Sequence, residues 1–189
     1  MMVLSQRIAL GFWLLFCVVW LASAFGVKRN IIRRPWWLRM PVRLTVLVIA
    51  IIVFGRWVRG AALMSTTPEL QPALAPLGAA LCTIGIAIAI WARLVIGRNW
   101  GMPMTLKAGH ELVTTGPYAW VRHPIYSGII LAMAGSVLVF SLWWLLILVV
   151  NAAQFFYAAR KEEKLMLRTF PGEYAVYMRR SWMLIPFVI

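Results

Sequence analysis

Apolar residues occupy four long blocks of this chain, and short polar connections separate the blocks. The blocks are residues 8–27, 42–64, 72–96 and 125–159. An α-helix rises about 1.5 Å per residue, so about 20 residues cross the roughly 30 Å hydrocarbon core of a bilayer. Each of the first three blocks therefore predicts one membrane-spanning helix, and we expect the first helix to be retained rather than cleaved as a signal peptide.

The fourth block is too long for one span, since a single helix would reach roughly 50 Å. We expect a helical hairpin that turns near Phe140 and Ser141, with one helix over 125–139 and the next over 142–159. Small residues recur at spacings of three and four on the first of these helices, at Gly128, Ala132, Gly135 and Ser136. They either let the next helix approach closely or simply reflect how common small residues are in membrane helices.

The basic residues of the connections predict the topology. Six of them lie between Lys28 and Arg43, in the first connection and directly after it, whereas the second connection, residues 65–72, contains none. Because Lys and Arg stay on the cytoplasmic side, we expect the first connection, the third connection and the basic tail to be cytoplasmic. Five spans, with the N-terminus outside and the C-terminus cytoplasmic, satisfy every connection. Arg56 and Arg59 lie toward the outer half of the second helix, where they snorkel to the interface or contact a headgroup or substrate.

The composition agrees with an integral membrane protein, because 63% of the residues are hydrophobic and only 13% are charged. We expect an all-α fold of five transmembrane helices in one membrane domain, 1–189, with three helices in 1–96 and the functional core in 97–189. The net charge of +14 is interpreted as topology signals and contacts with anionic membrane lipids, not with nucleic acid. We place the protein in a bacterial inner membrane.

Polar residues suited to chemistry are confined to the third connection, 97–124, and to the tail after residue 159. His123 followed by Pro124 predicts the start of a helix, whose N-terminus favours a carboxylate or phosphate. Arg122 strengthens that preference. No metal is expected, since His110 and His123 have no Cys or third His beside them, and both cysteines lie in apolar runs without a CxxC spacing.

An adjacent pair of carboxylates, Glu162 and Glu163, stands out because the chain has only five acidic residues. Such a pair needs a cationic partner. One possibility is a cationic ligand, and the other is an exposed ion-pair cluster with the neighbouring Arg160, Lys161 and Lys164.

Three stretches carry a resemblance to a known family. They are GHELVTTGPYAWVRHPIYSG at 109–128, RKEEKLMLRTFPGEYAVYMRR at 160–180 and WMLIP at 182–186. In these, the HxLV, GPY, RHPxY, EE and FxxxY elements occur in the order found in the isoprenylcysteine carboxyl methyltransferase family, which is related to phospholipid N-methyltransferases. The chain resembles that family over residues 97–186. The resemblance implies S-adenosylmethionine as cofactor, a cytoplasmic pocket formed by the third connection and the tail, and a lipophilic methyl acceptor that enters from the bilayer.

The resemblance also implies roles for individual residues. Cofactor contacts are implied for His110, Leu112, Val113, Tyr118, His123, Pro124, Tyr126, Glu162 and Glu163, with Glu163 favoured over Glu162. Arg160 resembles a basic residue that acts toward the acceptor, and His123 is a candidate to take a proton from an amine acceptor. Asn99 and Trp100 are expected to close the pocket.

Carboxyl O-methylation of a prenylcysteine-like or other lipophilic substrate is the leading hypothesis. It requires little acid or base catalysis, which agrees with the absence of an obvious triad. Phospholipid N-methylation and thiol S-methylation are alternatives within the same chemistry. Membrane sterol-type reductases that use NADPH carry an RHPxYxGE motif, but Ile129 stands here in place of its Glu. A lipid-binding protein without activity is the non-enzymatic alternative.

Overall fold

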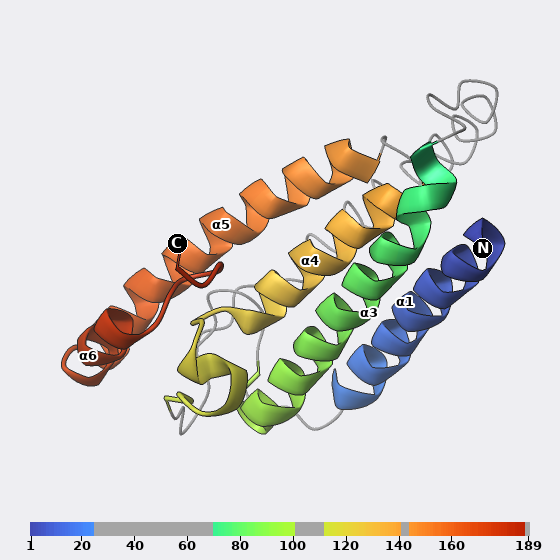
Figure 1. Cartoon of the computed structure of the whole chain (residues 1–189). Coiled ribbons are helices and arrows are strands. Elements are labelled where there is room, and N and C mark those ends of the chain that lie inside the picture. The colour runs from blue at the N-terminus through green and yellow to red at the C-terminus, as the bar shows by residue number, and fades with distance from the viewer. Residues whose placement is uncertain (25–69, 101–111, 141–143, 188–189) are drawn as a thin grey trace, which may run out of the picture.

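The computed structural model describes residues 1–24, 70–100, 112–140 and 144–187 (Figure 1). Its α-helices are α1 (Met2–Ala24), α3 (Leu70–Ile96), α4 (Pro124–Val139), α5 (Trp144–Thr169) and α6 (Glu173–Arg180). Two short 3₁₀ turns, η3 (Gly97–Asn99) and η4 (Gly116–Ala119), lie between α3 and α4. In the described part of the chain, extended backbone pairs only at one parallel bridge between Val121 and Trp182. The all-α prediction is confirmed for these residues.

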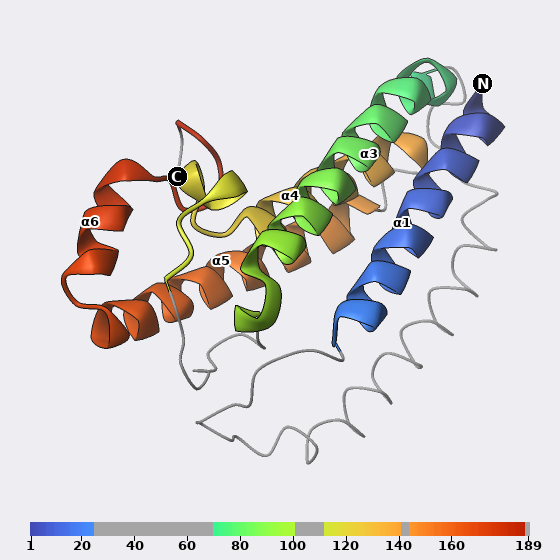
Figure 2. The ribbon, with the colours of Figure 1, turned by 90° about the horizontal axis from the view of Figure 1, so that it is seen from below.

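The four long helices lie side by side, with α3 between α1 and α4, and α5 on the other side of α4 (Figures 1 and 2). α1, α3 and α5 run in one direction and α4 runs in the other. The C-terminal ends of α1, α3 and α5 therefore lie toward the same end of the molecule as the start of α4. This end carries the third connection and the tail.

The small residues of α4 pack against α3. A Cβ atom added at Gly128 would lie 2.5 Å from the carbonyl oxygen of Gly85, and one added at Gly85 would lie 2.5 Å from the carbonyl oxygen of Gly128. Gly135 approaches Gly78 and Cys82 in the same way one level further along the helices. The expectation that this surface lets the following helix approach was wrong, because its partner is the preceding helix. Because glycine has no side chain, the two backbones come into contact. Helices in a bilayer associate through such close packing, since the hydrophobic effect does not favour helix–helix contact over contact with lipid.

α1 is joined to this pair by an indole hydrogen bond. The Nε1 of Trp13 donates to the Oγ of Ser136 over 3.0 Å, and that hydroxyl donates in turn to the carbonyl of Ala132 over 2.9 Å. Cys82 is fully buried in the same cluster, and both Cys82 and Cys17 are free thiols. Cys82 thus packs in the core, whereas Cys17 is exposed.

Two of the described helices, over Met2–Ser23 and Pro72–Ile96, are long and apolar enough to cross a membrane, and Pro124–Val139 is a shorter apolar helix. α1 also exposes large apolar side chains, among them Leu10, Leu14, Val18 and Leu21. Such a surface suits lipid tails better than water. Residues 42–64 of the expected second span, with Arg56 and Arg59, lie outside the described residues. The number of spans and the membrane hairpin therefore stay predictions.

The start of α4 agrees with the prediction from the sequence, whereas the end of α5 differs from it. α4 begins at Pro124 with His123 as its N-cap, as predicted. α5 continues to Thr169 instead of ending near 159. The added residues are mostly Arg, Lys, Glu, Leu and Met, which favour helix but do not continue an apolar pattern. As a result, Glu162 and Glu163 lie within a helix rather than in an irregular tail.

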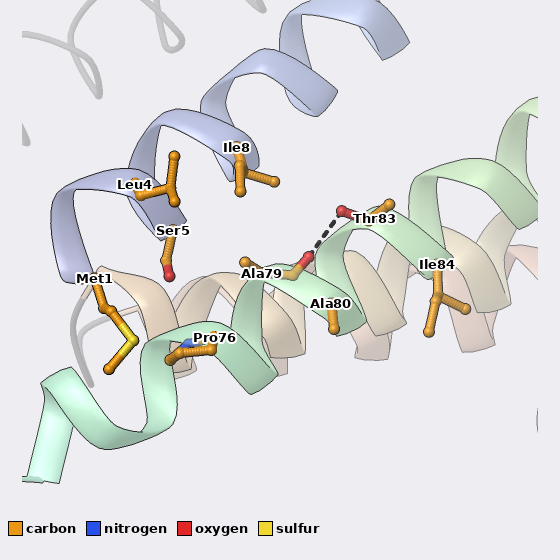
Figure 3. A pocket seen from close by; sticks show the side chains of 9 residues that line it. All are labelled: Met1, Leu4, Ser5, Ile8, Pro76, Ala79, Ala80, Thr83 and Ile84. Atoms are coloured by element: carbon orange, nitrogen blue, oxygen red, sulfur yellow. Dashed lines mark hydrogen bonds between the residues drawn. The ribbon is translucent and has the colours of Figure 1, made fainter.

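An apolar cavity of about 430 Å³ lies between the first turns of α1 and the start of α3 (Figure 3). Its lining includes Met1, Leu4, Ser5, Pro76 and Thr83. The Oγ1 of Thr83 is already bonded to the carbonyl of Ala79 over 2.9 Å. The cavity therefore offers mainly apolar surface, at the end of the bundle opposite to the third connection and the tail.

Candidate functional site

The third connection and the tail are joined by backbone hydrogen bonds. The N–H of Arg122 donates to the carbonyl of Trp182 over 2.8 Å, and the N–H of His123 donates to the carbonyl of Met183 over 3.1 Å. In the opposite sense, the N–H of Trp182 donates to the carbonyl of Trp120 over 3.0 Å. The structure thus brings together the two polar pieces from which the sequence predicted the site.

A buried ion pair connects the same two pieces. The Nε of Arg122 lies 2.6 Å from the Oε1 of Glu163, and the two side chains are only 9% and 7% exposed. The Nη1 of Arg122 also donates to the carbonyls of Ser181 and Met178. A carboxylate is stable at such depth only when it is paired and hydrogen-bonded. The partner of Glu163 is thus an arginine of the connection, and the alternative of an exposed cluster with Arg160 and its neighbours on α5 is wrong.

His123 lies between both carboxylates. Its Nδ1 is 3.4 Å from the Oε2 of Glu162, and its Nε2 is 3.7 Å from the Oε1 of Glu163. Burial lowers the pKa of His123, but hydrogen bonding and the charges of the two carboxylates outweigh burial and raise the pKa above its usual value. Burial raises the pKa of Glu163, but His123 and Arg122 outweigh it and lower that pKa. The cluster therefore combines Arg122 and His123 with two carboxylates, and these carboxylates favour the protonated form of His123.

Tyr126 holds the second carboxylate of the pair. Its hydroxyl donates to the Oε1 of Glu162 over 2.7 Å. Its ring stacks on His123 at 5.5 Å between centroids and on Phe155 of α5 at 4.8 Å. His123, the N-cap of α4, and Tyr126 meet because they are three positions apart, which places them on one face of the helix. The side chain of Glu162 is 23% exposed, so it is the more accessible of the two carboxylates.

An aromatic cluster adjoins these charged residues. Tyr118 and Ile125 are buried in it, and Val113, Trp100 and Tyr126 pack around them. The carbonyl of Tyr118 accepts a hydrogen bond of 2.6 Å from the hydroxyl of Tyr177 on α6. Burial raises the pKa of Tyr118, so its phenol is neutral at ordinary pH. Gly116 is the first residue of η4, the turn that contains Tyr118, and its φ of +60° is a backbone conformation that favours glycine.

The residues predicted as site residues lie in different environments. His123, Tyr126, Glu162 and Glu163 are in direct contact, and Val113 and Tyr118 lie in the adjoining aromatic cluster. Pro124 is fully buried at the start of α4, and Leu112 is half-buried. Arg160 is exposed on α5, with its guanidinium 5.1 Å from the ring of Phe156. His110 lies outside the described residues.

Arg93 was missed in the sequence because it lies within an apolar block. It is 3% exposed, and it donates to the carbonyls of Gly97 over 2.8 Å and Ser23 over 2.5 Å. Its guanidinium also lies 4.5 Å from the ring centre of Trp100. A cation suits the C-terminal ends of two helices, and here it fastens the ends of α1 and α3 beside the aromatic cluster. The sequence feature that could have pointed to Arg93 is its position as a single arginine in the last turn of an apolar helix.

Among the described residues, three buried polar atoms have no hydrogen-bond partner: the Nε of Arg93, the Oδ1 of Asn99 and the Nε2 of His123. Leaving such atoms unpaired typically costs about 1–3 kcal/mol each. His123 also caps α4 without a side-chain hydrogen bond to the helix. A polar ligand at the end of the bundle would satisfy such atoms. Within the described residues, no group of three His, Cys, Asp or Glu could hold a metal ion.

Comparison with known proteins shows a similarity to one family over part of the chain. The model of the isoprenylcysteine carboxyl methyltransferase (ICMT) family matches residues 78–168. A protein-S-isoprenylcysteine O-methyltransferase of Tribolium castaneum is 29% identical over 119 residues, which are 61% of this chain and 42% of that protein. The uncharacterized protein YpbQ of Bacillus subtilis (strain 168) is 37% identical over 62 residues, 32% of this chain and 37% of that protein.

The chain thus spans less than half the length of these curated relatives. The matched segment contains α4, the RHPxY motif and both glutamates of α5. The predicted resemblance is confirmed over residues 78–168, where the chain is similar to the isoprenylcysteine carboxyl methyltransferase family.

Proposed function

We propose that this protein is a membrane methyltransferase that uses S-adenosylmethionine to methylate the carboxylate of a prenylcysteine-like or other lipophilic substrate. The observation that carries the proposal is the cluster of Arg122, His123, Glu162 and Glu163, in which all but Glu162 are less than 10% exposed. It lies beside an aromatic cluster, at the end of the bundle where the family segment meets the tail.

The residues fit this cofactor chemically. S-adenosylmethionine has a sulfonium, an ammonium, a carboxylate and an adenine ring. Glu162 offers a partly exposed carboxylate to the cationic groups, and Tyr118 with Trp100 offers aromatic surface to the ring. The Nε2 of His123 is a buried polar atom in need of a partner. When bound, the cofactor supplies an electrophilic methyl group.

In the mechanism that we propose, the protein acts by positioning and by excluding water. Arg122 fixes Glu163, and the stack of His123, Tyr126 and Phe155 fixes the carboxylate of Glu162. A methyl group transferred in line to a carboxylate needs alignment in a dry site, and no proton has to be removed. The lipophilic acceptor would approach from the bilayer. Arg160 stays a prediction for the acceptor side, as does His110 for the cofactor.

The protonation of His123 supports a carboxylate acceptor over an amine. An amine must lose a proton before attack, so it requires a base. The two carboxylates beside His123 raise the pKa of its imidazole, which favours the protonated form, and that form cannot accept a proton from an amine. N-methylation of a phospholipid and S-methylation of a thiol remain alternatives of the same chemistry. Ile129 packs into the aromatic cluster at the position where the NADPH reductases carry Glu, which does not favour a reductase.

For the membrane, we propose one domain of five spans, with α4 and α5 as the hairpin, the N-terminus outside and the tail in the cytoplasm. The opposite directions of α4 and its two neighbours support this arrangement. The polar connection and tail meet at one end, away from Arg7 in the first turns of α1. A bacterial inner membrane stays the proposed location.

Calorimetry on the purified full-length chain in detergent tests the cofactor first. We expect S-adenosylmethionine to bind and NADPH not to bind. Glu162→Gln is expected to weaken binding of S-adenosylmethionine by about tenfold, since it removes a charge from the accessible carboxylate. Glu173→Gln removes an exposed charge from α6 and serves as the matched control. Binding of NADPH alone would contradict the proposal.

A further inference from the structure

The exposed surface of α5 changes character along the helix. In its first half it exposes apolar side chains, at Leu145, Leu146, Val149 and Val150. Two exposed aromatic residues follow, Phe156 and Tyr157. The next two turns expose four basic side chains, at Arg160, Lys161, Lys164 and Arg168. These four are called the basic face of α5, and Figure 1 shows this part of the helix continuing beyond α4 toward α6.

No carboxylate offsets this charge on the outside of the helix. The two glutamates between the basic residues turn inward, where Glu163 binds Arg122 and Glu162 binds Tyr126. Among the described residues, none of the four basic side chains forms an ion pair with a carboxylate. Arg160, Lys164 and Arg168 follow each other at intervals of four residues, where like charges repel. The basic face therefore favours an anion that the described residues do not supply.

Two cation–π contacts mark where the apolar part ends. The Nζ of Lys161 lies 4.3 Å from the ring centre of Tyr157, and the guanidinium of Arg160 lies 5.1 Å from that of Phe156. Aromatic residues beside Lys and Arg are typical of the boundary between hydrocarbon and headgroups. At about 1.5 Å per residue, Lys161 and Lys164 lie roughly 6 and 10 Å beyond Tyr157 along the axis. Both are within about one Debye length of the lipid surface.

We propose that the basic face of α5 binds the headgroups of anionic phospholipids at the cytoplasmic surface of the membrane. Charge complementarity argues for this partner, since a phosphodiester accepts hydrogen bonds from both ammonium and guanidinium groups. The apolar half of the same surface faces the acyl chains, so one lipid molecule matches both halves. The proposal does not depend on methyl transfer, because its test changes Lys161 and Lys164, to which the proposed reaction assigns no role.

Native mass spectrometry of the full-length chain in detergent tests the proposal. Phosphatidylglycerol and phosphatidylcholine with the same acyl chains are added in equal amounts, and the lipids retained on the protein are counted. We expect retention of phosphatidylglycerol over phosphatidylcholine. Lys161→Gln combined with Lys164→Gln should reduce that preference on the order of tenfold. The matched control, Lys161→Arg with Lys164→Arg, keeps both charges and should keep the preference.

Equal retention of both lipids by the unchanged protein would overturn the proposal, as would an undiminished preference in the double Gln variant. Far-ultraviolet circular dichroism verifies that the variants fold. If the double variant does not fold, Lys164→Gln alone carries the test, with an expected loss of a few-fold. Inorganic phosphate at the same ionic strength should not displace the lipid. Displacement by phosphate would mean that the face binds free anions rather than a membrane lipid.

Discussion

The packing of α3 on α4 and the contact between the third connection and the tail use opposite means. The packing of α3 on α4 relies on residues without side chains, since Gly85 and Gly128 let the two backbones come close together. The second relies on charge, with Arg122 bonded to Glu163 and to backbone carbonyls of the tail. Lipid tails are as apolar as the side chains, so helices within the membrane gain most from close fit. At the end of the bundle, where chain segments leave regular helix, polar groups need partners and supply the specificity.

Replacing Arg122, which joins the third connection to the tail, should lower the stability of the protein more than any other change described below. Arg122→Met leaves Glu163 buried without its partner, which typically costs about 3–5 kcal/mol. We expect thermal unfolding in detergent at a markedly lower temperature and a tail that proteases cut more readily. The double variant Arg122→Met with Glu163→Met leaves no unpaired charge and should recover part of the loss. If the single variant is as stable as the unchanged protein, the ion pair does not hold the tail.

An added methyl group should weaken the packing of α3 on α4. Gly128→Ala places its Cβ against the carbonyl of Gly85, so the helices must move apart, at a cost of about 1–3 kcal/mol. Gly11→Ala is the control, because nothing lies within 4 Å of the added Cβ and alanine favours helix. The midpoint of chemical unfolding in detergent should fall for the first variant and rise slightly for the second. Equal midpoints would mean that the helices are not in contact at Gly128.

Removal of one hydroxyl should weaken the connection of α6 to the site by a smaller amount. Tyr177→Phe deletes the 2.6 Å hydrogen bond to the carbonyl of Tyr118, at a cost of about 1 kcal/mol. Burial, more than its neighbours, raises the pKa of Tyr177 to about 12, so the hydroxyl remains a donor at ordinary pH. Hydrogen exchange should speed up in α6 and not in α3. Faster exchange throughout the bundle would contradict a local role.

The pH dependence of stability should be the smallest effect. The pKa of Glu163 is lowered from its usual 4.5, so its contribution is present above pH 4.5 and is lost as the pH falls through the lowered value. The pKa of His123 is raised from its usual 6.5, so its contribution is present below pH 6.5 and is lost as the pH rises through the raised value. Both contributions are complete between these limits. A series of melting temperatures should therefore be highest there, and His123→Gln should remove the decline on the alkaline side.

Sequence reasoning succeeded where a short local pattern decides the structure. The pair His123–Pro124 marked the start of α4, and hydropathy located α3. The end of α5 was missed because the helix-favouring residues after 159 are not apolar. The partner of the small residues on α4 was also missed, since a stripe of glycines does not specify which neighbouring helix it meets.

The candidate site could be predicted only in part, because contacts between distant positions leave no local pattern in the sequence. The glutamate pair and the RHPxY motif could be recognised, and the motifs indicated that they form one pocket. The bond from Arg122 to Glu163 joins positions 41 residues apart, so no periodic pattern indicates it. The same holds for Arg93, whose partner Ser23 lies 70 residues away on another helix.

Methyl transfer to a lipophilic carboxylate is the central claim, and the product itself tests it most directly. The purified full-length chain is incubated with S-adenosylmethionine labelled in the methyl group and with a prenylated cysteine whose carboxylate is free. We expect label in the lipid fraction that mild alkali releases as methanol, because only a carboxyl ester is cleaved in this way. Label that resists alkali, or label found only with amine or thiol acceptors, would contradict carboxyl methylation.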